Sequence, residues 1–549
     1  MGRTSSWIAL ALLAPSACTD PTDEDAVVPE ISTTSTGSGG EEASGPGTGV
    51  SQSGGSTSEV QEDGSSESTA NVDGGETDAP VGPACLADLF AGTPGELAEL
   101  EISIDFNGRP AIGDLDGDGF PDFVISARDR IAGYSSCGDK LWEVPAQTNW
   151  DFAGHYFWNL TTYGYIGDAD GDGTPEFLHI GSDWRTLLVY DGPTGALEQT
   201  IELPAEAEWM YVMLARRVDD ASDAATRVVV AGPALSSSFD IAAYDLRSGE
   251  ATREWAFSQP MGAAISVYLT PQAANLDGTG GDEIVFGTLA LREDGTKLWQ
   301  FDVGGMSILS AIHAATAADI DPARPGLEAV YSIYAPNAGQ PSLVAYGAEA
   351  SSEIWRTPSP QSELHPHQHT VGDFDPERDG LEILARNGNG INHWMTDAQG
   401  TVIRPDWRVA PGWDGEGEYV QAIEWDATEG TEVLYLERHV ENDGTHAIRS
   451  RMVVTSPIDD APRTPVFGGG VMEDTRTWTG ITDQAYFNPY EAAGIVVDMI
   501  GDGREEVFTW GNGLVTIVYA TGDASFARRW PDGDYQALKK LSCPLYSPR

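Results

Sequence analysis

The stretch Asp114-Leu115-Asp116-Gly117-Asp118-Gly119-Phe120-Pro121-Asp122 places acidic side chains at its first, third, fifth and ninth positions. It runs directly into the apolar segment Phe123-Val124-Ile125. Oxygen ligands at this spacing, with glycines where the backbone must turn sharply, are what a hard cation such as Ca²⁺ requires. The stretch therefore predicts a cation-binding loop that leads into a β-strand.

The same loop-strand unit recurs along the chain. A second copy, from Asp168 to Glu176, is almost intact, and further copies begin at residues 219, 275, 319, 373, 424 and 498. The copies at 319 and 373 are one residue longer, and the copy at 219 has Arg227 where the final acid should stand. Most copies lie about 50 residues apart, which is typical of propeller blades or solenoid coils. The repeats predict a chain built from eight similar units.

The candidate metal ligands are the oxygen-bearing side chains at the repeated loop positions. They are Asp114, Asp116, Asp118, Asp122, Asp168, Asp170, Asp172, Glu176, Asn275, Asp277, Glu283, Asp319, Asp321, Glu328, Asp373, Asp375, Glu382, Glu424, Asp426 and Glu432. A structural ion that fixes a strand crossover is favoured over a catalytic metal for each loop. For the poorer copies, including those at 219 and 498, a plain solvated turn is the alternative.

A second signal follows each loop-strand unit. An apolar run, an Asp/Gly turn and a strand that often ends in Trp come next, as in Glu293-Asp294-Gly295 before Trp299. Asp/Gly turns between alternating apolar runs are hairpin signals. Four short strands in each unit predict an all-β protein, an eight-bladed β-propeller with Ca²⁺-binding loops. Seven blades are the fallback, and an open β-solenoid is disfavoured because its coils are usually much shorter.

The first part of the chain has a different composition from the rest. Residues 1–18 predict a lipoprotein-type signal peptide, with Arg3, a short apolar core and small residues before Cys18, which would carry the lipid. Plain secretion is the alternative. Residues 19–82 are rich in Ser, Thr, Gly and acids, so we expect a disordered acidic linker that acts as a stalk. The predicted propeller then occupies residues 83–549.

The net charge of −56 limits the possible partners. Nucleic acids and anionic membrane surfaces both reward Lys and Arg, so neither is expected to bind, and membrane contact is expected only through the lipid anchor. A polysaccharide or an extracellular protein remains as the partner of a monomeric protein located at the bacterial cell envelope or surface. Export permits a disulfide, and because the two ends of a propeller meet, we expect Cys85 to pair with Cys543. Cys137 could pair with either instead.

The sequence lacks a nucleotide-binding glycine loop, a Gly-x-Ser-x-Gly elbow and a His-Glu-x-x-His zinc motif. The unusual cluster is His365, His367 and His369, just before the loop at Asp373, and His313 occupies a similar place before Asp319. Alternating residues of a strand share a face, so the three histidines could converge on a metal or relay a proton. A polar strand near the central channel is the favoured alternative.

The loops resemble the repeats of FG-GAP and VCBS (integrin-type) propellers. More specifically, the segments Ala318–Glu328, Val371–Glu382 and Asn275–Trp299 resemble blade motifs of family 11 rhamnogalacturonan lyases, and the likeness is best over residues 270–440. That resemblance implies a secreted eight-bladed propeller that uses Ca²⁺ and cleaves pectin backbones by β-elimination. No catalytic residue can be carried over by motif, and no counterpart of the family's N-terminal β-sandwich is seen.

β-Elimination needs a base for the proton alpha to the uronate carboxylate. The chain has four lysines, Lys140 and Lys297 in hairpins expected to face outward and Lys539 and Lys540 near the end. The candidate bases are therefore His313, His365, His367, His369 and Arg386. We expect a surface-tethered Ca²⁺-binding propeller that binds a polysaccharide or protein and need not be catalytic. The alternatives are an active lyase on rhamnogalacturonan or a related uronate polymer, and an integrin-repeat-like adhesion module.

Overall fold

The computed structural model describes Cys85 and residues 97–106, 108–127, 129–146, 164–181, 183–205, 209, 211–220, 225–232, 238–260, 271–300, 312–333, 341–348, 352–360, 366–387, 392–408, 419–425, 430–440, 448–458, 464–465, 495–499, 504–511 and 514–520. The chain divides into two units, Met1–Ala79 and Pro80–Arg549, and every described residue lies in the second. The expected leader with Cys18, the linker up to residue 82, His365, Asp426 and Cys543 lie outside the described residues. Within the described part of the chain, we find no helix with the length and apolar character of a membrane span.

The described elements are 32 β-strands in eight antiparallel sheets of four strands each, and each sheet is one blade. Blade 1 contains β2 (Arg109–Gly113), β3 (Asp122–Ser126), β4 (Arg130–Tyr134) and β5 (Lys140–Pro145). Blade 2 contains β6 (Tyr165–Gly167), β7 (Glu176–Ile180), β8 (Thr186–Asp191) and β9 (Leu197–Glu202). Blade 3 contains β10 (Tyr211–Ala215), β11 (Arg227–Gly232), β12 (Ser238–Asp245) and β13 (Thr252–Pro260). Blade 4 contains β14 (Gln272–Ala274), β15 (Glu283–Phe286), β16 (Leu289–Leu291) and β17 (Lys297–Gln300).

The remaining blades repeat this order, except that the last one takes its fourth strand from the beginning of the described chain. Blade 5 contains β18 (Ile312–Ala318), β19 (Glu328–Ile333), β20 (Pro341–Gly347) and β21 (Ser352–Pro358). Blade 6 contains β22 (Pro366–Gly372), β23 (Glu382–Asn387), β24 (Asn392–Thr396) and β25 (Val402–Arg408). Blade 7 contains β26 (Tyr419–Ile423), β27 (Glu432–Val440), β28 (Ile448–Thr455) and β29 (Thr464–Pro465). Blade 8 contains β30 (Ile495–Val497), β31 (Glu506–Gly511), β32 (Leu514–Ala520) and β1 (Leu97–Ser103).

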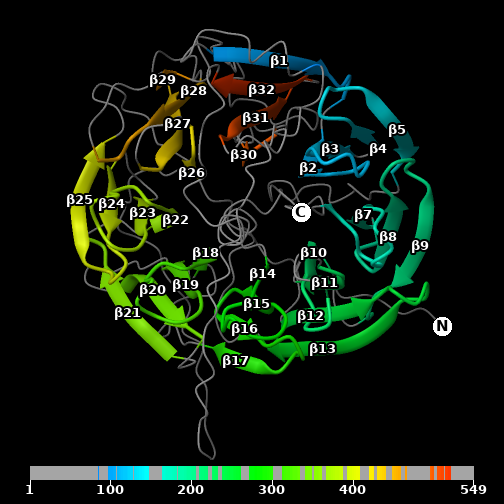
Figure 1. The fold of residues 1–549 in the computed structure, drawn as a ribbon, viewed down its shortest axis with the longest axis horizontal. Coiled ribbons are helices and arrows are strands. Elements are labelled where there is room, and N and C mark those ends of the chain that lie inside the picture. The colour runs from blue at the N-terminus through cyan, green and yellow to red at the C-terminus, as the bar shows by residue number, and fades with distance from the viewer. Residues whose placement is uncertain are drawn as a thin grey trace, which may run out of the picture. The chain divides into compact units, whose positions relative to one another are not determined.

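The eight blades follow one another around a ring, with the first strand of each toward the centre and the fourth at the rim (Figure 1). The first strands of neighbouring blades contact each other, as β18 and β22 do. This arrangement is a β-propeller, so the prediction of an all-β, eight-bladed propeller is confirmed. Each acidic repeat found in the sequence lies between the first and second strands of its own blade.

The second strand of each blade is buried on both faces because neighbouring blades pack against it from either side. All five residues of β3 and all six of β11 are buried, whereas Trp142 is the buried residue of the rim strand β5 and its other residues are half-buried or exposed. Strands covered on both faces read as continuous apolar runs, which explains why Phe123-Val124-Ile125 and Val228-Val229-Val230 lack the alternation of a half-exposed strand.

The ring is closed by pairing β1 with β32, with Leu97 opposite Ala520 and Ser103 opposite Leu514. The two blades that meet there also share a core, in which the rings of Phe123 and Phe508 stack edge to face with centroids 5.3 Å apart. Closure therefore rests on strand pairing and apolar packing between the two ends of the propeller.

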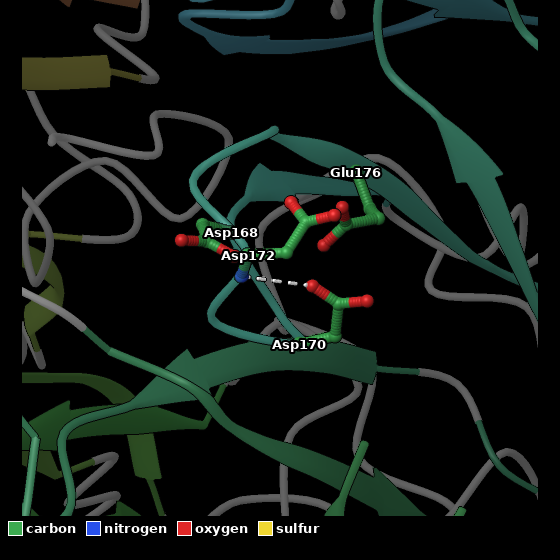
Figure 2. A group of neighbouring side chains, drawn as sticks. All are labelled: Asp168, Asp170, Asp172 and Glu176. Carbon is green, nitrogen blue, oxygen red and sulfur yellow. Dashed lines mark hydrogen bonds between the residues drawn. The ribbon is translucent and has the colours of Figure 1, made fainter. Parts of the chain in front are cut away.

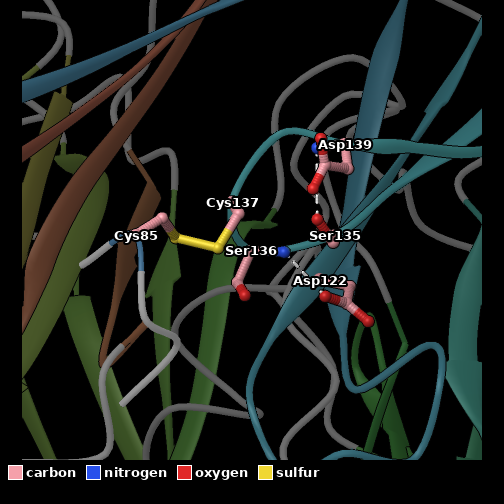
Figure 3. Close-up of a disulfide and its surroundings, with 6 residues drawn as sticks. All are labelled: Cys85, Asp122, Ser135, Ser136, Cys137 and Asp139. Carbon is pink, nitrogen blue, oxygen red and sulfur yellow. Dashed lines mark hydrogen bonds between the residues drawn. A yellow bond between two sulfur atoms is a disulfide. The ribbon is translucent and has the colours of Figure 1, made fainter. Parts of the chain in front are cut away.

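The disulfide that we expected between Cys85 and Cys543 is not the one in the structure. Cys85 is bonded to Cys137, which lies in the hairpin between β4 and β5 (Figure 3). The reason is the position of β1, the first described strand after Cys85, which forms the rim of blade 8 next to the blade 1 hairpin. A Cβ placed on Gly138 of that hairpin would lie only 2.7 Å from Ile102 of β1, so the two segments are closely packed.

Tryptophans at the rim join each of several blades to the next, which explains the Trp pattern seen in the sequence. The indole N–H of Trp142 donates to the carbonyl of Gly192 in blade 2 (2.6 Å), and that of Trp255 donates to Glu293 in blade 4 (2.9 Å). The ring of Trp255 also covers Gly295, where a Cβ would lie 2.6 Å from the ring. A glycine is required there because its φ is +78° and the ring leaves no room for a side chain.

Candidate metal centres

All the acidic loops lie at one face of the propeller. Each loop connects the first strand of a blade to the second, as residues 114–122 connect β2 to β3 and residues 168–176 connect β6 to β7. Because the strand order is the same in every blade, the connections between first and second strands leave the ring on the same side.

The second loop gathers the most complete set of ligands. One carboxylate oxygen from each of Asp168, Asp170, Asp172 and Glu176 lies within 4.8 Å of the others (Figure 2). Backbone N–H groups orient these carboxylates: Asp172 donates to Asp170 (3.1 Å) and Gly173 donates to Asp168 (3.0 Å). Four carboxylates on a short turn, each with one oxygen close to the others, suit a hard cation.

The first loop gathers three carboxylates in the same way, from Asp114, Asp116 and Asp122. Asp118 is not part of this group, and its carboxylate instead accepts the backbone N–H of Phe120 (2.8 Å). Within the described ranges, these first two loops are where three or more acidic residues come together in this manner.

The final acid of each loop has a second task, which the sequence pattern did not predict. It is buried and accepts the backbone N–H of the second or third loop residue, so that it holds the turn closed. Leu115 donates to Asp122 (3.1 Å), Ala169 to Glu176 (2.6 Å) and Ile320 to Glu328 (2.9 Å). The same bond forms at Glu283, Glu382, Glu432 and Glu506.

Burial and crowding perturb these carboxylates strongly. Burial, followed by the charge of Asp116, raises the pKa of Asp122 to about 8, and burial raises the pKa of Glu176 to about 8 with a further contribution from Asp170. The pKa of Glu382 is raised to about 7 by burial and by the charges of Asp373 and Asp375. Each of these three loops thus needs either a proton or a cation to relieve the charge, and a cation suits a cluster of carboxylate oxygens.

The loop of blade 6 keeps one feature of a metal site. Glu382 is fully buried, and while its Oε2 accepts the N–H of Asp375 (2.8 Å), its Oε1 has no hydrogen-bond partner. In this loop Arg378 pairs with Asp375 (2.7 Å), and in blade 5 Arg324 pairs with Asp321 (3.3 Å). Both arginines lie in the two loops that are one residue longer than the others.

Among the described residues, the other predicted ligands lie in their loops without forming a comparable group. In blade 4, Asn275 takes the first position, Asp277 accepts the N–H of Thr279 (2.8 Å), and Glu283 closes the turn. In blade 5, Asp319 follows β18 directly. In blade 7, the carboxylate of Glu424 accepts the hydroxyl of Thr431 (2.8 Å), and Asp373 of blade 6 joins that loop through its carbonyl, which accepts the N–H of Thr431 (2.7 Å).

The structure separates the candidate bases. The Nδ1 of His369 lies 2.6 Å from the Ser332 hydroxyl of blade 5, and burial lowers the pKa of His369 to about 3. Arg386 is paired with Gln368 of β22 and with His393 of β24, so it lies on the opposite face of this sheet from His369. On the face of Arg386, the ring of His393 meets the ring of Tyr435 in blade 7. His369 and Arg386 therefore do not share a site. His313 lies in β18 and His367 in β22, with side chains outside the described part.

Residues 226–449 match the family model described as "Rhamnogalacturonan lyase family 11, C-terminal domain". The rhamnogalacturonan exolyase YesX of Bacillus subtilis (strain 168) is 24% identical over 416 residues, covering 61% of this chain and 66% of YesX. The rhamnogalacturonan endolyase YesW of the same organism is 25% identical over 337 residues, covering 51% of each chain. The chain thus spans between half and two thirds of the length of these curated relatives.

Two solved structures share the fold. The crystal structure of exotype rhamnogalacturonan lyase YesX superposes with a TM-score of 0.57 at 20% identity, covering 82% of this chain and 78% of that one. The structure of rhamnogalacturonan lyase YesW superposes with a TM-score of 0.51 at 19% identity, covering 86% and 80%. In sequence and in fold, the propeller of this chain resembles the family 11 rhamnogalacturonan lyases.

Proposed function

We propose that this chain is a Ca²⁺-loaded β-propeller that binds an acidic polysaccharide of the rhamnogalacturonan type. The observation that carries the proposal is the match of residues 226–449 to the C-terminal domain of a family named for rhamnogalacturonan lyases. The relatives YesX and YesW are named for the same polymer, which supports a polysaccharide as the ligand class.

Calcium would be held first by the loops of blades 1 and 2. The ligands would be Asp114, Asp116 and Asp122 in one loop, and Asp168, Asp170, Asp172 and Glu176 in the other. The unpartnered Oε1 of Glu382 supports a further site in blade 6. Bound Ca²⁺ would neutralise these carboxylates and fix the turn between the first and second strands, and it would reduce the net charge of −56 that repels an acidic polymer.

Binding without cleavage is favoured by the positions of the candidate bases. The two lysines of the described residues, Lys140 and Lys297, begin the rim strands β5 and β17, and both are exposed there. His369 is enclosed between blades 5 and 6 and is only 4% exposed. Its low pKa keeps the imidazole neutral, but its burial shields it from solvent. An abstracting base has to reach the substrate proton within hydrogen-bond distance, and a lysine at the outer rim or a histidine enclosed between blades is poorly placed for that.

Cleavage by β-elimination is the second candidate function, and the family match favours it. One experiment decides between the two. Purified protein is run by affinity electrophoresis through gels with rhamnogalacturonan I, with polygalacturonate as the control polymer, in Ca²⁺ and in EGTA. In parallel, the ultraviolet absorbance of the unsaturated uronate product is followed in solution. We expect Ca²⁺-dependent retardation by rhamnogalacturonan I without a rise in absorbance. A rise selects the lyase, and failure to bind either polymer removes both functions.

We also propose that the protein is exported and tethered at the cell surface through Cys18. The support is the short apolar segment with small residues before Cys18, and the acidic linker that follows it. Replacement of Cys18 by Ser should move the protein from the membrane fraction to the medium or periplasm. Unchanged fractionation of Cys18→Ser would contradict the lipid anchor.

A further inference from the structure

The loop of blade 3 differs from the others at both ends. In the other seven blades the first strand is followed by Asp, Asn or Glu, and the second strand begins with Asp or Glu. In blade 3, Arg216 follows β10 and Arg227 begins β11. The structure thus corrects the expected start of this repeat from Asp219 to Arg216, because strand ends define the frame. Both positions that elsewhere carry an oxygen ligand carry an arginine.

An aspartate inside this loop replaces the missing final acid as the group that closes the turn. The backbone N–H of Arg217 donates to Asp220 (2.8 Å), as Leu115 does to Asp122 in blade 1. The hydroxyl of Thr226 also donates to Asp220 (2.7 Å). The Asp220 side chain is only 2% exposed, so its charge needs a nearby cation.

The guanidinium of Arg247 supplies that cation. Its Nη1 lies 3.2 Å from Asp219 and 3.8 Å from Asp220, and its Nη2 lies 3.0 Å from Asp245. The Nε of Arg247 also donates to Asp245 (3.0 Å), which makes that pair bidentate. Three carboxylates therefore surround this positive group, and Arg217 also pairs with two of them, Asp219 (3.2 Å) and Asp245 (3.5 Å).

Two more arginines extend the network toward blade 4. Arg217 pairs with Glu254, and Arg227 donates to the same Glu254 (2.8 Å) and approaches Glu293 (4.0 Å). The side chains of Arg217 and Arg227 are 11% and 8% exposed, so these pairs are shielded from solvent.

The electrostatic consequence is opposite to that in the first two loops. Hydrogen bonds from Arg247 lower the pKa of Asp219 and of Asp245, whereas burial raises the pKa of Asp122 and of Glu176. The carboxylates of blade 3 are already compensated by a cation that belongs to the chain.

We propose that the loop of blade 3 binds no metal ion, because the guanidinium of Arg247 is its built-in cation among Asp219, Asp220 and Asp245. This inference rests on the proposed Ca²⁺ binding of the other loops. It means that the charges of the blade 3 loop are balanced whether or not metal is present.

Arg247 also lies close to a proposed metal centre. A Cβ placed on Gly171, in the middle of the blade 2 loop, would lie 3.6 Å from the Arg247 side chain. The nearest atom of Arg247 is its Cγ, so the aliphatic part of this side chain packs against the blade 2 loop while its guanidinium is bonded to Asp245.

Crystals of the full chain soaked in Tb³⁺ as a substitute for Ca²⁺ test the proposal directly. We expect anomalous peaks within the loops 114–122 and 168–176 and none among Asp219, Asp220 and Asp245. A peak among those three aspartates overturns the inference. If every loop lacks a peak, the Ca²⁺ part of the proposed function fails, and the variants below then decide whether Arg247 acts as the cation.

The variant Arg247→Met keeps the length of the side chain and removes its charge. Its matched control is Arg253→Met, in the exposed part of β13 of the same blade. In EGTA, we expect Arg247→Met to melt about 3–6 °C below the control. Arg247→Lys should recover part of the difference because it retains the charge. Equal melting temperatures for Arg247→Met and Arg253→Met would overturn the assignment.

Discussion

The backbone N–H of Ser136 donates a hydrogen bond of 2.7 Å to Oδ1 of Asp122, the final acid of the first loop (Figure 3). Ser136 immediately precedes Cys137, which is bonded to Cys85 just before the ring-closing strand β1. The other oxygen of Asp122 accepts the N–H of Leu115 (3.1 Å). One hairpin therefore connects the disulfide, the ring closure and a proposed metal ligand.

The double variant Cys85→Ser/Cys137→Ser should weaken both the ring and the first metal centre. The disulfide closes a loop with a sequence separation of 52, and its loss should cost about 4 kcal/mol of unfolding free energy. A loosened hairpin orients Asp122 less well, so we expect roughly tenfold weaker Ca²⁺ affinity in that loop. Denaturant unfolding and calcium titration measure the two effects. The control is Cys543→Ser, and equal behaviour of the two variants would show that the disulfide supports neither.

The effect of Glu176→Gln on the stability of the protein should depend on whether Ca²⁺ is present. The glutamine oxygen can still accept the N–H of Ala169, so the turn stays closed, but the buried charge is gone. In EGTA, we expect the variant to be at least as stable as the wild type. In saturating Ca²⁺, it should gain about 2–3 kcal/mol less than the wild type does. Thermal melting with and without Ca²⁺ measures this, with the exposed Glu202→Gln as control. A variant that is less stable than the wild type in EGTA would contradict the prediction.

Without metal, the protein should lose stability as the pH rises from 6.5 to 8. The pKa of Asp122 and of Glu176 rises from 3.8 and 4.5 to about 8 on folding, so the folded state holds more protons in this window and unfolding becomes easier as they leave. Burial lowers the pKa of His179 from 6.5 to about 4 and that of His369 from 6.5 to about 3. Because the unfolded state binds protons at these histidines more readily, they destabilise the folded protein only below pH 6.5. Melting temperatures in EGTA should fall by several degrees across the window, and excess Ca²⁺ should remove the trend. A flat profile in EGTA would argue against the perturbed carboxylates.

Gly295→Ala should destabilise the protein more than Gly249→Ala. Both glycines have a φ of +78°, so each alanine pays the same left-handed strain of about 1–2 kcal/mol. Only at Gly295 does the added Cβ meet a ring, 2.6 Å from Trp255, whereas nothing lies within 4 Å of a Cβ at Gly249. The extra loss should be about 1–3 kcal/mol, measured by denaturant unfolding of the two variants. Equal losses would mean that the Trp255 contact between blades 3 and 4 contributes nothing.

Several features could be predicted from the sequence because they depend on local patterns. The spacing of Asp114, Asp116 and Asp122 indicated the loop, and the apolar run Phe123-Val124-Ile125 indicated the buried strand that follows it. Repetition of that unit predicted eight blades, and the structure confirms them. The sequence shows the Trp residues of the rim strands but does not show that they link neighbouring blades, because the carbonyl that each indole binds belongs to the next blade.

Other features could not be predicted because they join residues that are distant in the sequence. The acidic residues of the sequence placed the start of the third loop at Asp219, whereas the end of β10 places it at Arg216. The compensating Arg247 lies in the hairpin between β12 and β13, outside this loop. His369 and Arg386 were both candidate bases, yet the pairing of β22 with β23 places them on opposite faces of the sheet.

The amino-acid sequence by itself determined the repeated turn, because its closing hydrogen bond joins residues that are seven or eight apart, and the apolar run marked the strand that follows. Only the tertiary structure decided how the ring closes, which cysteine Cys85 meets and which loop carries its own cation. The physical reason is that these outcomes depend on which side chains from different blades come within hydrogen-bond or ion-pair distance once the blades pack together.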